Sequence, residues 1–78
     1  MTTTKRTFYF GTTEVIQEVR LYEDGYMHRL IIGTITSEWA SFHFPAHLVL
    51  GNRTFVSIID GRTIFPTVFE VIGGLEKV

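Results

Sequence analysis

The sequence predicts a small, mostly β domain of about six short antiparallel strands, arranged as a small barrel, a roll or a curved sheet. Three observations lead to this fold class. The chain has 78 residues, of which 45% are hydrophobic and 14% aromatic, so we expect a single compact domain over residues 1–78. Short runs rich in Val, Ile, Phe and Thr alternate with Gly, Asp and Pro. Two Asp-Gly pairs, at residues 24–25 and 60–61, lie between such runs and predict tight hairpins.

The other elements are predicted in the same way, from the positions of glycine and proline between the apolar runs. A first short strand begins at Thr7 and ends at Gly11. Pro45 ends a later strand at residues 39–44, because proline has no N–H for the ladder. One short helix is predicted near 45–50, with Pro45 at its first position and Gly51 just past its end. The remaining strands are expected at residues 54–59, 62–65 and 68–72.

The first Asp-Gly pair predicts a hairpin between residues 14–22 and 26–32. A type I′ turn needs a positive φ at both central residues, which Asp24 and Gly25 tolerate. A helix at 13–22 is the alternative, because Val15 and Val19 lie four apart, and it would make the fold α+β. The Val and Ile content and the following Asp-Gly pair favour the strand.

One face of this hairpin is the predicted partner-binding surface, formed by Arg20, Tyr22, Met27 and Arg29. A two-residue turn puts Arg20 opposite Arg29, and like charges directly across a ladder are unfavourable. Three explanations stay open: another register, diagonal relief by Glu18, or an anionic partner. Arg, Tyr and Met are enriched at interface hot spots, and an ordinary solvated face is the alternative interpretation.

The C-terminal runs place apolar residues on both faces of their strands, as in strands covered on both sides. A domain of this size buries only about 60% of its unfolded surface, so some apolar side chains stay available for contacts. We therefore expect a homodimer formed through these strands, with the interface residues Phe55, Ile59, Ile64, Phe65 and Phe69. The alternative is that the N-terminal hairpin covers them within one monomer.

No pattern of catalytic or cofactor-binding residues is present, so we expect no enzyme, no cofactor and no metal. The absence of cysteine excludes disulfides and thiolate metal sites. His43 and His47 lie four apart, but Pro45 between them prevents one continuous helix from aiming both at a metal. A small metal-dependent enzyme that uses these two residues and His28 is a minor alternative.

Residues 37–65 resemble the swapped-hairpin transition-state regulators and antitoxins. The matching points are Phe44-Pro45, Leu50-Gly51 and Asp60-Gly61. The resemblance covers under half of the chain and implies a short helix that ends in Leu-Gly, and DNA binding. Most of the basic residues that the family uses on DNA are missing here. DNA-binding regulation is thus the second functional hypothesis, and it predicts Arg20, Arg29, Arg53 and Arg62 on one face.

The leading hypothesis is a non-catalytic interaction protein that binds and blocks or scaffolds another macromolecule. The net charge of −1 disfavours nucleic acid as the partner, because phosphate binding needs a basic surface. No run of about 20 apolar residues predicts a membrane span, and no signal peptide is recognisable, so we expect a cytoplasmic protein. An accessory inhibitor made by a phage or plasmid, acting in an infected host cell, fits this size and composition.

Overall fold

The computed structural model describes residues 2–41, 44–58 and 67–71. In this part the chain forms antiparallel strands and no helix, which confirms the mostly β class. The strands are β1 (Thr2–Phe10), β2 (Thr13–Tyr22), β3 (Gly25–Ile32), β4 (Ile35–Thr36), β5 (Ala40–Ser41), β6 (Ala46–Leu50), β7 (Arg53–Ile58) and β8 (Thr67–Val71). The second Asp-Gly pair, at residues 60–61, lies outside the described residues. No helix among the described residues is long and apolar enough to cross a membrane.

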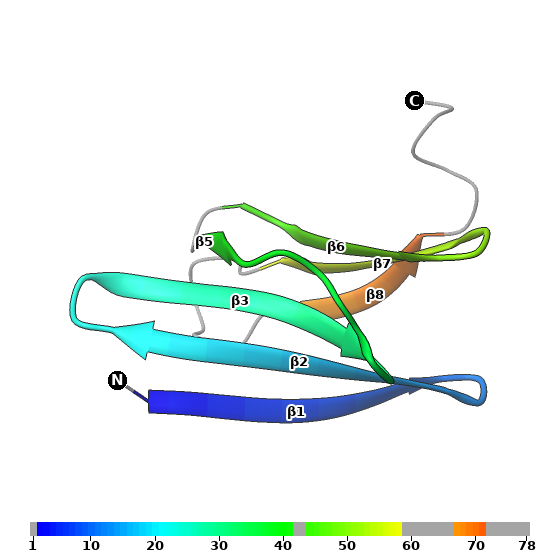
Figure 1. Cartoon of the computed structure of the whole chain (residues 1–78), viewed down its shortest axis with the longest axis horizontal. Coiled ribbons are helices and arrows are strands. Elements are labelled where there is room, and N and C mark those ends of the chain that lie inside the picture. The colour runs from blue at the N-terminus through cyan, green and yellow to red at the C-terminus, as the bar shows by residue number, and fades with distance from the viewer. Residues whose placement is uncertain (1, 42–43, 59–66, 72–78) are drawn as a thin grey trace.

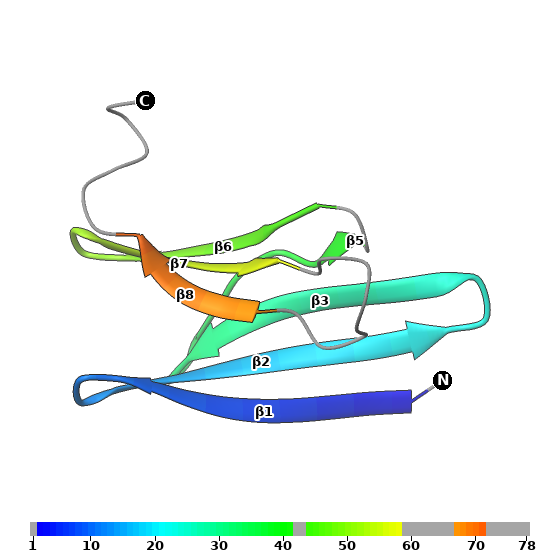
Figure 2. The same ribbon diagram turned by 180° about the vertical axis from the view of Figure 1, so that it is seen from behind.

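The strands form two sheets that pack face to face (Figures 1 and 2). The first sheet has the order β1-β2-β3-β4, and β5 pairs with β3 beside β4. The second sheet has the order β6-β7-β8. The two sheets do not close into a barrel. The order follows the chain because tight turns join most neighbouring strands, which is typical of antiparallel sheets.

Two of the turns carry glycine for a physical reason. Gly11 joins β1 to β2 with a φ of 70°, and Gly51 joins β6 to β7 with a φ of 64°. No described residue other than glycine has a positive φ. A positive φ at the first loop residue alone is the type II′ pattern, whose twist suits a hairpin. Both turns lie at the same end of the molecule, at the right of Figure 1.

The helix predicted near 45–50 is wrong, because residues 46–50 form β6. Ala46 and Leu48 are buried, whereas His47 and Val49 are exposed, and this alternation is that of a strand with one covered face. Leu48 lies opposite Phe55 on β7 and joins the same core. The helix considered as an alternative at 13–22 is also absent, since these residues form β2.

The register of the first hairpin differs from the predicted one. Glu18 lies opposite Arg29, and Arg20 lies opposite Met27. The turn residues are therefore Glu23 and Asp24, with Gly25 as the first residue of β3. Asp24 does not take the positive φ that a type I′ turn requires. The shift of two positions keeps every side chain on its predicted face and removes the Arg–Arg pair.

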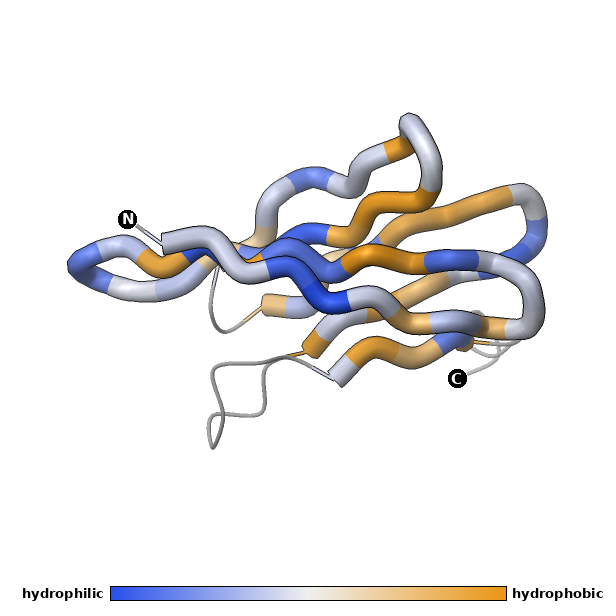
Figure 3. Tube along the Cα trace, turned by 90° about the horizontal axis from the view of Figure 1, so that it is seen from below, coloured by the Kyte–Doolittle hydropathy of each residue, from blue (hydrophilic) through white to orange (hydrophobic). Residues whose placement is uncertain are grey.

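The core lies between the sheets, toward the end where Gly11 and Gly51 turn. Its buried members are Val15, Leu30, Leu48, Phe55 and Val68. Phe8, Phe10, Ile32 and Leu50 pack against them. Hydrophilic residues gather at the opposite end, at the tip of the hairpin that joins β2 to β3 (Figure 3).

Candidate interaction site

The outer face of the first sheet carries a cluster of charged residues around Glu18. Arg29 donates from Nε to Glu18 Oε1 over 2.7 Å, and Arg20 Nη2 lies 3.6 Å from Glu18 Oε2. The Glu18 side chain is only 5% exposed, whereas those of Arg20 and Arg29 are 30% and 26% exposed. One buried carboxylate therefore holds two partly exposed cations on one face. Glu18 thus supplies the counter-charge for the two arginines, and it lies directly opposite Arg29 on the neighbouring strand.

Trp39 covers this group from the segment between β4 and β5. The guanidinium carbon of Arg20 lies 4.6 Å from the Trp39 ring centroid, and that of Arg29 lies 4.5 Å from it. Both distances are within the range of a cation–π interaction. We call these four residues (Glu18, Arg20, Arg29 and Trp39) the Arg–Trp cluster. Its charge is one net positive, and Trp39 itself remains half-buried.

Ser37 positions Trp39. The Leu30 N–H donates to Ser37 Oγ over 2.9 Å, and the Ser37 N–H donates to the Leu30 carbonyl over 2.8 Å. The serine side chain thus replaces a backbone acceptor at the edge of β3, between the pairs made by β4 and by β5. Trp39, two residues later, is thereby held over the face that carries the two arginines.

Arg20 Nε is buried and has no hydrogen-bond partner in the described part of the chain. A buried donor without a partner costs about 1–3 kcal/mol. The guanidinium of Arg20 thus retains donor capacity that Glu18 does not use.

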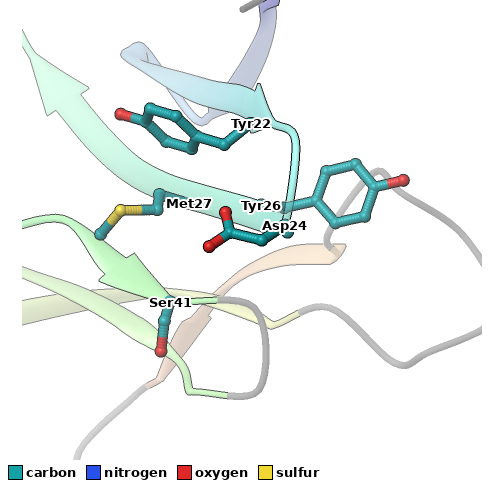
Figure 4. A pocket seen from close by; sticks show the side chains of 6 residues that line it. Tyr22, Asp24, Tyr26, Met27 and Ser41 are labelled. Carbon is teal, nitrogen blue, oxygen red and sulfur yellow. The ribbon is translucent and has the colours of Figure 1, made fainter.

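A cavity of about 380 Å³ adjoins the cluster at the tip of the hairpin. It is lined by Tyr22, Asp24, Gly25, Tyr26, Met27 and Ser41. Tyr22 and Met27 extend in the same direction from neighbouring strands, and the Tyr26 ring extends in the opposite direction (Figure 4). All four residues of the predicted partner-binding surface therefore lie on one outer face, two in the Arg–Trp cluster and two in the cavity wall.

The predicted dimer interface is divided in the structure. Phe55 is fully buried in the core of its own chain, with its ring centroid 5.4 Å from that of Phe10, so it offers no surface to a second copy here. Phe69 is 37% exposed on the outer face of the second sheet. Ile59, Ile64 and Phe65 lie outside the described residues.

The histidines do not form a metal site in the described part of the chain, where no group of three potential ligands is found. His28 is fully buried between the sheets, and both of its ring nitrogens have partners. His47 is exposed on the outer face of the second sheet. His43 lies outside the described residues.

Arg53 lies apart from the arginines of the cluster. It donates from Nε to Glu70 Oε2 over 2.8 Å and from Nη1 to Thr13 Oγ1 over 2.6 Å. Arg53 Nη2 also lies 3.2 Å from the Phe10 carbonyl, which ties β7 to the first hairpin. The hydrogen bond between Arg53 and Glu70 lowers the pKa of the Glu70 carboxyl and raises the pKa of the Arg53 guanidinium. The single basic face of the DNA-binding hypothesis therefore does not include Arg53, and Arg62 lies outside the described residues.

Sequence reasoning missed Trp39 as a member of the site and also missed the cavity residues Ser41 and Tyr26. Trp39 and Ser41 alternate with apolar residues in the run 39–44, and this alternation predicts that both lie on the same face of a strand. Nothing in this local pattern indicated which strand they would cover. Their contacts with β3 come from the course of the chain after β4.

Comparisons of the chain with protein-family models, with curated proteins and with solved structures found no match.

Proposed function

We propose that this chain is a non-catalytic interaction protein that binds another protein through the outer face of its first sheet. Binding there blocks or scaffolds the partner. The site comprises the Arg–Trp cluster and the adjoining cavity between Tyr22 and Met27. The observation that carries the proposal is the position of two partly exposed guanidinium groups against one tryptophan ring, with their carboxylate partner buried.

The composition of this face supports the proposal. Trp, Tyr, Arg and Met are the residues enriched in interface cores and hot spots. Stacking on Trp39 and the ion pair with Glu18 restrict the arginine side chains before any partner arrives, so less side-chain entropy is lost on binding. The cavity beside Met27 offers a place for an apolar partner side chain.

Site-specific photo-crosslinking tests the proposal. A photoreactive amino acid at Tyr22 should capture one discrete protein in a lysate of the source cells. The same amino acid at Val49, which is exposed on the second sheet, should not capture it. Capture of the same protein at both positions, or at Val49 alone, would move the site away from the first sheet.

The affinity for the captured protein then tests the individual side chains. We expect Tyr22→Ser and Met27→Ser each to weaken binding by about tenfold or more, as for hot-spot residues. Val49→Ser is the matched control on the other sheet. Charge reversal at Arg29 is a poor test, because a second carboxylate beside buried Glu18 would destabilise the fold.

A further inference from the structure

Strand β1 forms an edge of the first sheet. It is nine residues long, Thr2–Phe10, and pairs along its whole length with β2. On its other side no strand is paired with it among the described residues. Such an edge presents a row of backbone N–H and C=O groups that can pair with another strand. Tyr9 on this strand is 69% exposed, which is the largest exposed fraction among the large hydrophobic residues in the described part of the chain.

Geometry restricts how β1 can pair with β1 of a second copy around a two-fold axis. In an antiparallel ladder two paired residues either both direct their backbone N–H and C=O groups toward the partner strand or both direct them away, and the two orientations alternate along β1. The axis therefore passes beside one residue, which then faces its own copy. The candidates near the middle of the strand are Lys5, Arg6 and Thr7.

The side chains distinguish these registers. An axis at Lys5 places two lysines opposite each other, and an axis at Arg6 places two arginines opposite each other, which is unfavourable in both cases. An axis at Thr7 places Thr7 opposite Thr7, a favourable cross-strand pair. Axes farther from the middle pair shorter stretches of the strand.

The register centred on Thr7 also pairs each cation with an aromatic ring. Residues 4–10 of each copy then form the ladder, with Lys5 opposite Tyr9 and Arg6 opposite Phe8. Within one chain the Arg6 guanidinium already lies 4.9 Å from the Phe8 ring centroid, so this face of the strand suits cation–π contacts. Thr4 lies opposite Phe10, whose half-buried ring gains cover.

We propose that a second copy of this chain is the partner of the β1 edge, in the two-fold antiparallel register that places Thr7 opposite Thr7. The first sheet of one copy and the first sheet of the other then form one continuous sheet across the dimer. The Arg–Trp cluster of each copy stays outside the interface. The proposal is independent of the proposed function, since it uses a different strand.

Cysteine cross-linking tests the register directly, because the chain has no cysteine of its own. Thr7→Cys should give a covalent dimer in high yield with a short bis-maleimide linker or on mild oxidation. Thr3→Cys is the matched control: it is exposed on the same face of the same strand, and the two copies would lie about 26 Å apart at 3.3 Å per residue. Dimers from Thr3→Cys but not from Thr7→Cys would overturn the proposed register.

An exchange of two residues tests the affinity of the dimer without any cross-link. Tyr9→Lys places two lysines opposite each other at two symmetric positions and should weaken the dimer by about tenfold in sedimentation analysis. The exchange variant, Lys5→Tyr with Tyr9→Lys, restores a lysine–tyrosine pair and should recover the affinity. A wild-type chain that sediments as a monomer would overturn the proposal. A dimer unaffected by Tyr9→Lys but dissociated by Phe69→Ser would also overturn it, in favour of the second sheet.

Discussion

The imidazole of His28 and the hydroxyl of Ser57 join the two sheets, with 3.0 Å between Nδ1 and Oγ. His28 Nε2 lies 2.7 Å from the Phe44 carbonyl, which can only accept, so Nε2 carries the proton. Nδ1 of the neutral ring then accepts from Ser57. Burial lowers the pKa of His28 below its ordinary value of 6.5, and the hydrogen bond to the Phe44 carbonyl only partly opposes this.

This pKa predicts a loss of stability in weak acid. Below about pH 6.5 the unfolded chain binds a proton at His28 that the folded chain does not, so the free energy of unfolding falls. The slope is at most about 1.4 kcal/mol per pH unit while the folded imidazole stays neutral. Urea unfolding between pH 7.5 and 5.5 measures it. His28→Gln should flatten the dependence, and His47→Gln, at an exposed position, is the control. An unchanged slope in His28→Gln would contradict the prediction.

The ion pair between Arg53 and Glu70, on neighbouring strands of the second sheet, predicts a loss of stability in the same direction at lower pH. Because Arg53 lowers the pKa of Glu70, the carboxylate stabilises the fold above its ordinary pKa of 4.5, and this is lost as the pH falls through the folded value. Glu70→Gln should therefore destabilise the protein at pH 7 and lose its effect in acid. Arg53→Lys should also lower the thermal midpoint, because an ammonium group cannot form the two-pronged contact. Equal destabilisation by Glu70→Gln at all pH values would contradict the assignment.

Glu18 is expected to hold the Arg–Trp cluster together. Glu18→Gln leaves two neighbouring guanidinium groups without a counter-charge, and we expect the free energy of unfolding to fall by about 1–2 kcal/mol, a modest value because both arginines are partly solvated. Chemical denaturation measures the change. Glu14→Gln, on the same face of the same strand but exposed, should have no effect. A Glu14 variant as destabilised as the Glu18 variant would remove the special role of Glu18.

Two phenylalanines on the second sheet should differ sharply in their contribution to stability. Phe55→Ala removes a fully buried ring from the core and should cost about 3–5 kcal/mol. Phe69→Ala removes a ring that is 37% exposed and should cost distinctly less. Urea unfolding of both variants checks the difference. Similar losses would mean that the outer face of the second sheet is covered as fully as the core.

The fold class was predictable from the alternation of apolar and polar residues, and so was the face shared by Arg20 and Arg29. The register was not, because the Asp-Gly pair favours one turn and the pairing of Glu18 with Arg29 favours another. The strand at residues 46–50 was mistaken for a helix because Pro45 and Gly51 match helix ends. Its pairing with β7 outweighed that local signal.

The Arg–Trp cluster was only half predictable. Arg20 and Arg29 lie on consecutive strands, whose faces follow from a period of two. Trp39 reaches them only because the chain returns along the edge of β3, held by Ser37. That path depends on tertiary contacts, which local sequence patterns do not encode.

Trp39 is the only tryptophan in the chain. The described contacts of its ring are with Arg20 and Arg29, which both belong to the first sheet. Its fluorescence therefore reports on one layer of the molecule without any added label, whereas far-ultraviolet circular dichroism reports on both. Coincident denaturation curves from the two signals would mean that the layers melt as one cooperative unit. An earlier change in emission would mean that the first layer loosens while the second persists.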